Sequence, residues 1–218
     1  AERRGFRIFD ATCPLVTKVH VEVAKLFKEG YEFLMIGHKG HPEVEGTMGQ
    51  LSEGIHLVED IDDVARVQPK QTDLLAVVTQ TTLSVDDTAG ILAAVKARFP
   101  KVREPKQQDI CYATQNRQDA VKLLSPQVDI VIVVGSPTSS NSNRLREVAH
   151  RLGTEAYMVD NEGELKAEWF EGKQRVGLTA GASAPDILVQ QVIDRLRELG
   201  AIAVRRMDGL TETLSLIH

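Results

Sequence analysis

The spacing of the two cysteines is the feature that most constrains the fold, because each cysteine stands at the start of what reads as one repeated unit. Cys13 lies 24 residues before Gly37, and Cys111 lies 24 residues before Gly135. Each interval holds an amphipathic segment and then a short apolar run that leads into a polar loop. We therefore expect an internal repeat. The alternative is ordinary α/β periodicity with two cysteines placed alike by coincidence.

Strands and helical segments alternate within each copy, and this order is typical of parallel βαβ units. The expected strands are at residues 33–36 and 74–78 in the first copy, and at residues 130–134 and 175–179 in the second. The sequence thus predicts an α/β protein of two pseudo-repeated parallel-sheet domains.

A polar connector at residues 100–108 separates the copies, so we place the two domains at residues 1–107 and 108–218. Two domains suit a chain of this length better than one. Both ends read as incomplete, with a strand at residues 6–9 close to the start and a strand cut short at residues 210–218. We therefore expect the sequence to be part of a longer protein.

Composition argues against several classes of function. The formal net charge of −5 does not suit a nucleic-acid surface. No apolar run reaches the roughly 18 residues that a membrane span needs, and we expect no signal peptide. Two cysteines in a chain this long do not make the disulfide framework of a secreted protein, so we expect a cytoplasmic setting.

Cys13 follows the strand expected at residues 6–9, and Pro14 suits the first turn of the helix after it. A thiol at a helix N-terminus favours the thiolate, which is the form that binds metals. Ligands of open α/β sheets bind beyond the carboxyl ends of the strands, and Cys111 has the same place in the second copy. We therefore expect both thiols to face a common centre that holds a metal cluster, whereas Cys13 alone would read as a buried structural cysteine.

The loop at residues 37–50 combines histidines, glutamates and glycines at a strand end. His41 and Glu43 can hold and deliver protons there. The spacing of His38 and His41 does not by itself predict a zinc site, because we expect Pro42 to break the helix that would align such ligands. The alternative is a solvated polar turn.

Hydroxyl side chains follow the strand at residues 74–78. Ser84 or Asp86 can cap the next helix, and Thr81 and Thr82 come just before that cap. The two threonine hydroxyls either point into a site or serve the capping alone.

The second copy has a polar run at residues 136–143 that leads into a helix expected at residues 144–152. Backbone N–H groups and polar side chains at a helix N-terminus bind phosphate or carboxylate. Ser183 can reach the same anion or cap the helix expected at residues 185–199. Neither a P-loop nor a dinucleotide fingerprint is present, which argues against a nucleotide. The alternative is a low-complexity linker.

Six motifs together resemble the LytB-type 4-hydroxy-3-methylbut-2-enyl diphosphate reductases of the non-mevalonate isoprenoid pathway. They cover nearly the whole chain, and they are DATCPLVTKVH (residues 10–20), GHPEVEGTMGQ (40–50), TQTTLSVDDT (79–88), DICYAT (109–114), SSNSNRL (139–145) and TAGASAP (179–185).

The resemblance implies a three-domain, pseudo-threefold α/β protein around a [4Fe-4S] cluster, held by one cysteine from each domain. It also implies reductive removal of the substrate hydroxyl to give isopentenyl and dimethylallyl diphosphate. Flavodoxin or ferredoxin is the electron donor that the family suggests. Cys13 and Cys111 match the second and third cluster cysteines.

The same motifs suggest roles for the remaining site residues. Glu43 matches the proton relay, His41 matches its partner in proton delivery and substrate contact, and Thr81 matches the threonine near the substrate hydroxyl. The residues that match the diphosphate pocket are Ser139, Ser140, Asn141 and Ser183.

The resemblance implies that the family's first domain lies outside this sequence, and with it the first cluster cysteine. Two cysteines do not complete the expected site, so we expect the chain alone to be inactive. Two other hypotheses are a non-catalytic diphosphate-binding fragment and a zinc site on Cys13, Cys111 and a histidine. The presence of Glu43 and His41 favours a truncated enzyme.

Overall fold

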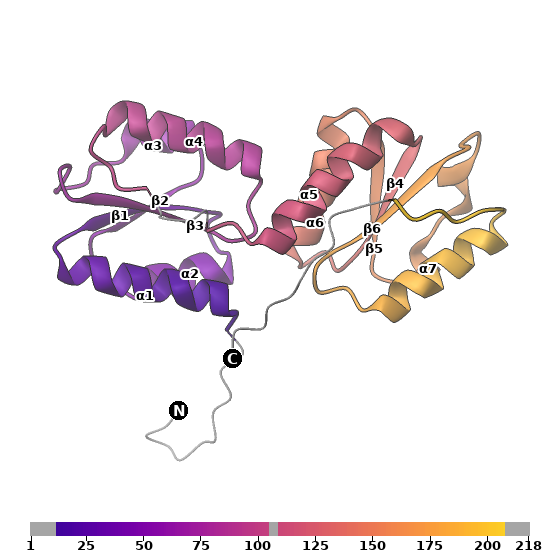
Figure 1. Cartoon of the computed structure of the whole chain (residues 1–218), viewed down its shortest axis with the longest axis horizontal. Coiled ribbons are helices and arrows are strands. Elements are labelled where there is room, and N and C mark those ends of the chain that lie inside the picture. The colour runs from indigo at the N-terminus through magenta and orange to yellow at the C-terminus, as the bar shows by residue number, and fades with distance from the viewer. Residues whose placement is uncertain (1–11, 105–108, 208–218) are drawn as a thin grey trace, which may run out of the picture. The chain divides into compact units, whose positions relative to one another are not determined.

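The computed structural model describes residues 12–104 and 109–207, and the chain divides into two compact units, Ala1–Cys111 and Tyr112–His218 (Figure 1). The domain boundary expected after residue 107 lies outside the described residues. The terminal strands expected at residues 6–9 and 210–218 lie outside them as well.

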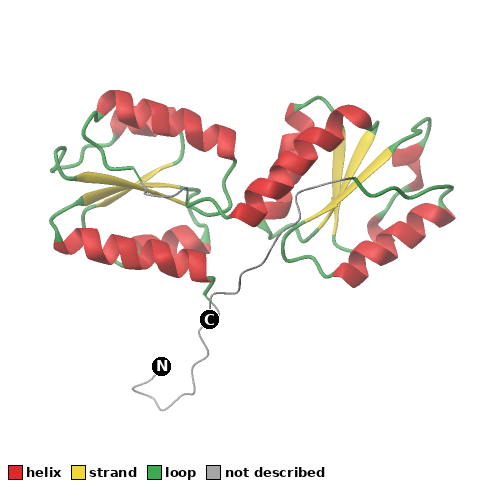
Figure 2. Ribbon diagram, in the orientation of Figure 1, coloured by secondary structure: helices red, strands yellow, loops and turns green. Residues whose placement is uncertain are grey.

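In its described part, the first unit is a parallel sheet in the order β2-β1-β3 with helices on both faces (Figure 2). Its elements are α1 (Pro14–Lys28), β1 (Glu32–Ile36), α2 (Pro42–Met48), β2 (Ile55–Val58), α3 (Ile61–Arg66), β3 (Leu75–Thr79) and α4 (Val85–Arg98).

The second unit has the same sheet order, β5-β4-β6, and is also parallel throughout the described residues. Its elements are α5 (Tyr112–Leu124), the 3₁₀ turn η2 (Ser125–Gln127), β4 (Ile130–Val134), α6 (Ser140–Arg151), β5 (Glu155–Val159), the 3₁₀ turns η3 (Glu162–Glu164) and η4 (Ala167–Phe170), β6 (Val176–Ala180) and α7 (Asp186–Glu198).

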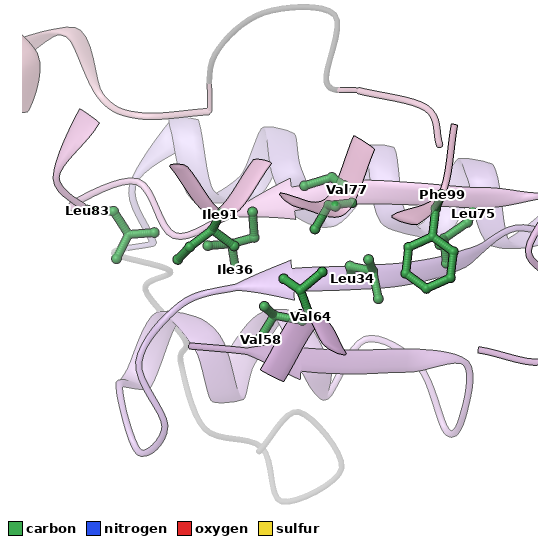
Figure 3. Close-up of a cluster of buried hydrophobic side chains, with 10 residues drawn as sticks. Leu34, Ile36, Val58, Val64, Leu75, Val77, Leu83, Ile91 and Phe99 are labelled. Carbon is green, nitrogen blue, oxygen red and sulfur yellow. The ribbon is translucent and has the colours of Figure 1, made fainter. Parts of the chain in front are cut away.

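The central strand of each unit is buried on both faces, which explains why its sequence is a continuous apolar run. In β1, Leu34 and Ile36 pack against α3 and α4 (Figure 3), whereas Phe33 and Met35 pack against α1 and α2. Each such side chain contributes about 1.5–3 kcal/mol when it is fully buried. Burial on both faces therefore fixes β1 at the centre of the sheet, with its carboxyl end beside those of its neighbours.

The repeat expected from the cysteines is confirmed in the order of the strands and in the helices before and after the central strand. Cys13 directly precedes α1, the first described helix of the first unit, and Cys111 directly precedes α5, the first helix of the second unit. The helix that follows the central strand is capped by the side chain of His41 in the first unit and of Ser139 in the second. These two caps are separated by the same number of residues, 98, as the two cysteines. Equivalent positions of the two units can therefore be compared directly.

A glycine at the end of each central strand lets the next helix approach closely. A Cβ atom on Gly37 would lie 2.5 Å from Cγ2 of Val44, and one on Gly135 would lie 2.1 Å from Oγ of Ser142. Real Cβ atoms do not tolerate such contacts. The first turns of α2 and α6 thus pack directly on the carboxyl ends of β1 and β4.

Two expectations about these helices were wrong. Pro42 does not break a helix but begins α2, because proline suits the first helical turn, where its missing N–H costs no hydrogen bond. The helix expected at residues 144–152 begins at Ser140, because Ser139 caps it by accepting a hydrogen bond from the N–H of Ser142.

Candidate functional site

The first unit brings two of the predicted site residues into direct contact. Glu43 lies in the first turn of α2, and Thr81 follows the end of β3. The N–H of Thr81 donates to Oε1 of Glu43 at 2.7 Å, and the hydroxyl of Thr81 donates to Oε2 at 3.0 Å. The carboxyl group is therefore fixed in place by one neighbour.

The environment of Glu43 favours its protonated form. Burial raises the pKa of Glu43 above its ordinary value, and the two hydrogen bonds from Thr81 offset part of that rise. A carboxyl group with a raised pKa can release a proton nearer to neutral pH than an exposed one. Glu43 is thus suited to deliver a proton.

His41 is arranged as a neutral hydrogen-bond donor. Its Nδ1 accepts a hydrogen bond from the N–H of Glu43 at 3.3 Å. Burial lowers the pKa of His41, and the neighbouring His38 lowers it further. In a neutral imidazole whose Nδ1 accepts, Nε2 carries the proton. His41 therefore presents an N–H group beside Glu43.

Cys111 is attached by its backbone to the same strand end. Its N–H donates to the carbonyl of Thr81 at 2.9 Å. Two residues earlier, Oδ2 of Asp109 accepts from the N–H of Thr79 at 3.1 Å. Burial raises the pKa of Asp109 to about 6, with the bond from Thr79 opposing that rise. Thr81 therefore bonds both to the backbone of Cys111 and to the carboxyl group of Glu43.

Cys13 is the exposed N-cap residue of α1, and it makes no side-chain capping bond. Both Cys13 and Cys111 are free thiols, and sulfur ligands are the donors that iron–sulfur clusters require. Within residues 12–104 and 109–207, no three His, Cys, Asp or Glu side chains gather into a group that could hold a metal ion. The residues present thus fit such a cluster in donor type but not in number.

The second unit places three predicted residues at the N-terminus of α6. Ser139 is the N-cap, and Ser140 and Asn141 form the first turn. Asn141 is only 6% exposed, and neither atom of its carboxamide has a hydrogen-bond partner among the described residues. Because buried polar groups are nearly always paired, this carboxamide is suited to a bound ligand. The helix dipole favours an anion there.

Ser183 lies in the exposed turn between β6 and α7. It does not cap the helix as one alternative proposed, since Pro185 is the N-cap and makes no side-chain bond. A Cβ atom on Gly181 would lie 3.8 Å from Nδ2 of Asn141, so the start of this turn adjoins the unpaired carboxamide.

Sequence reasoning missed two residues at these strand ends. Gln80 is fully buried and bonds to the loop after β1 and to the loop after β3. Asp109, two residues before Cys111, accepts a hydrogen bond from the backbone of Thr79. Gln80 lies in the motif TQTTLSVDDT, and Asp109 lies in the motif DICYAT. The signal for Gln80 was its place directly after a buried strand.

Fold and side chains together define an α/β protein with polar side chains gathered at the carboxyl ends of its parallel strands. Within that class the chain belongs to the LytB family, because the family model described as LytB protein matches residues 1–197. The resemblance noted in the motifs and the α/β class are both confirmed.

Among its relatives, the chain is 81% identical over 214 residues to the 4-hydroxy-3-methylbut-2-enyl diphosphate reductase of Polaromonas sp. (strain JS666), covering 98% of this chain and 64% of that protein. It is 77% identical to the reductase of the same name from Methylibium petroleiphilum, covering 98% and 65%. The chain thus spans slightly less than two thirds of these relatives.

Solved structures have the same fold. The E-1-hydroxy-2-methyl-but-2-enyl-4-diphosphate reductase from Plasmodium falciparum matches with a TM-score of 0.82 at 38% identity, over 85% of this chain and 58% of that chain. A second structure, described as (E)-4-hydroxy-3-methyl-but-2-enyl diphosphate reductase, matches with a TM-score of 0.56 at 37% identity, over 90% and 70%. In the described part of the chain, no helix is long and apolar enough to cross a membrane.

Proposed function

We propose that the chain supplies two of the three α/β domains of a 4-hydroxy-3-methylbut-2-enyl diphosphate reductase. The reaction removes the allylic hydroxyl as water, consumes an electron pair and protons, and yields isopentenyl or dimethylallyl diphosphate. The observation that carries the proposal is the half-buried Glu43 carboxyl, held by Thr81 next to the backbone of Cys111. Family membership and the names of the relatives support it.

The first unit handles the proton. Glu43 is the proton donor, because burial raises its pKa and so favours the protonated form. Thr81 orients the carboxyl and lies beside the departing hydroxyl. His41 stays neutral and donates from Nε2 to the substrate.

The second unit holds the diphosphate. The N-terminus of α6 supplies a dipole that favours an anion, and the amide of Asn141 supplies a hydrogen-bond donor. The hydroxyls that complete this pocket are those of Ser139, Ser140 and Ser183. Fixing the diphosphate also fixes the hydroxyl, so the pocket contributes to catalysis by positioning.

Cys13 and Cys111 would hold a [4Fe-4S] cluster, with a third thiolate from a domain outside these 218 residues. When bound, the cluster supplies the electrons that the reduction needs. A cytoplasmic flavodoxin or ferredoxin would deliver them. Because two thiolates are too few, the chain alone is inactive on this proposal.

The test measures iron, acid-labile sulfide and reductase activity after anaerobic reconstitution, on this chain and on the full-length protein that contains it. We expect the full-length protein alone to hold about four of each and to be active. Serine variants at Cys13 and Cys111 should lose iron. Activity of the isolated chain would contradict the proposal. Zinc in place of iron would favour a zinc site. Diphosphate binding without iron in the full-length protein would favour a non-catalytic, diphosphate-binding role.

A further inference from the structure

We propose that Gln80 is a positioning residue that sets the geometry of the His41–Glu43 pair by tying the loop after β1 to the loop after β3. The inference rests on the proposed function, and it adds a residue that touches neither substrate nor cluster. It follows from burial, from hydrogen bonds and from the difference between the two units.

Gln80 is fully buried, and both ends of its carboxamide are used. Its Oε1 accepts from the N–H of His38 at 3.0 Å, and its Nε2 donates to Oγ1 of Thr82 at 2.8 Å. Its own N–H donates to the carbonyl of Ile36 at the end of β1. A buried carboxamide with both ends bonded has one orientation, so Gln80 acts as a rigid brace between two strand ends.

These bonds belong to a closed ring. From Gln80 the ring passes to His38, whose carbonyl accepts from the N–H of His41 at 3.1 Å. His41 accepts from the N–H of Glu43, and Glu43 accepts from Thr81, the residue after Gln80. Four of the five links are hydrogen bonds, and the fifth is the peptide bond between Gln80 and Thr81. Moving Gln80 therefore disturbs both the bond of Glu43 to His41 and its bond to Thr81.

The second unit lacks this brace. Gly181 occupies the place of Gln80, since its N–H donates to the carbonyl of Val134 as that of Gln80 does to Ile36. The space beside Gly181 is filled by the hydroxyl of Ser142, which would lie 2.1 Å from an added Cβ atom. The unit with Glu43 thus has a carboxamide where its repeat has none. The brace is therefore confined to the unit that carries the Glu43 contact.

The test compares Gln80→Met with Gln118→Met in the full-length, cluster-loaded protein. Methionine is close to glutamine in length and makes neither hydrogen bond. Gln118 is also a buried glutamine, at 1% exposure, but it lies in α5 of the second unit. A third variant, Gln80→Glu, keeps an acceptor towards His38 and is the conservative replacement.

For Gln80→Met we expect kcat per bound cluster to fall about 10- to 100-fold, the range seen when a supporting residue of a site is lost. KM should change much less, because the second unit holds the diphosphate. Gln80→Glu should recover part of kcat. Its added charge should also shift the high-pH limb of the rate profile upward, because it raises the pKa of Glu43. The titratable groups in this ring are His38, His41 and Glu43. Asp109 bonds to Thr79 at the end of β3, and Lys18, Glu22 and Glu43 act on its charge.

Amide hydrogen exchange gives a readout that does not depend on activity. Gln80→Met should lose protection at the N–H of His38 and at the N–H of Thr81, whereas Gln118→Met should lose neither. Loss at His38 alone, with kcat per cluster unchanged, would reduce Gln80 to a structural residue and overturn the inference. If the unsubstituted protein has no reductase activity, the proposed function fails, and the exchange at Thr81 still decides whether Gln80 positions the Glu43 contact.

Discussion

Thr81 donates two hydrogen bonds to the single carboxyl group of Glu43, one from its N–H and one from its hydroxyl. The two bonds stabilise the carboxylate, while burial favours the protonated form more strongly. Burial and the bonds from Thr81 therefore shift the pKa of Glu43 in opposite directions, and substitution of Thr81 can remove the hydroxyl bond.

Replacing Thr81 by valine removes the hydroxyl bond and keeps the backbone bond. Because that bond favours the carboxylate, we expect the pKa of Glu43 to rise further in Thr81→Val. Thr81→Ser keeps a hydroxyl and should leave the pKa where it is. A ¹³C titration of the Glu43 carboxyl measures both, and a pKa that falls in the valine variant would contradict the assignment of the bond.

Glu43→Gln separates proton delivery from stability. The amide can accept from the N–H of Thr81 and donate to its hydroxyl oxygen, so both contacts survive while the acidic proton is lost. We expect reductase kcat in the full-length protein to fall by about 100- to 10,000-fold, as for a general acid. An active glutamine variant would exclude Glu43 as the donor.

The same variant should change how stability depends on pH. Above the ordinary pKa of 4.5 and below the raised pKa of the folded protein, the folded state binds more protons at Glu43 than the unfolded chain does. The free energy of unfolding therefore falls as pH rises through this window. Glu43→Gln should remove that fall, so its thermal midpoint should exceed the wild-type value at pH 7 and match it near pH 4.

The sequence predicted the repeat because strand burial and helix periodicity are local patterns. Ser84 caps α4 as one alternative expected, and β4 has the expected ends. The start of α2 was missed, since Pro42 breaks a helix interior and favours a helix start for the same physical reason. The end of β1 decides whether Pro42 lies inside a helix or at its start.

The bonds of Gln80 and Asp109 could not be predicted from local patterns. Gln80 bonds to His38 across 42 residues, and Asp109 bonds to Thr79 across 30 residues. A polar residue directly after a buried strand marks such a candidate, but its partner is defined only once the strand order is known. The site residues therefore remain predictions, and the contacts among them are what the structure adds.

Any side chain at Gly135, the glycine that follows β4, should destabilise the protein. Gly135→Ala would place a Cβ atom 2.1 Å from Oγ and 2.7 Å from Cβ of Ser142, so we expect a loss of about 1–3 kcal/mol or more in the free energy of unfolding. Gly90 in α4 has open space beside it, and Gly90→Ala should instead gain about 0.5–1 kcal/mol from helix propensity. Urea titrations compare the two, and equal effects would refute the close approach of α6 to β4.

Asn141 and Asn143 provide a matched pair on α6. The amide of Asn143 donates to the carbonyl of Pro137 at 2.7 Å and to that of Ser139 at 3.0 Å, whereas that of Asn141 has no partner among the described residues. In the ligand-free protein, Asn143→Ala should therefore cost about 1–3 kcal/mol for its lost bonds. Asn141→Ala should cost less, because no bond is lost and a buried unpaired group is removed.

Binding should show the opposite order. Isothermal titration with inorganic diphosphate should show weaker affinity for the full-length Asn141→Ala variant, by roughly tenfold for one lost hydrogen bond to a charged group. The Asn143→Ala variant should keep wild-type affinity in the temperature range where it is folded. A residue that costs little to remove and yet weakens binding is one that is kept for the ligand. If Asn141→Ala destabilises the protein as much as Asn143→Ala and leaves diphosphate affinity unchanged, Asn141 is a structural residue and the anion site at α6 must be abandoned.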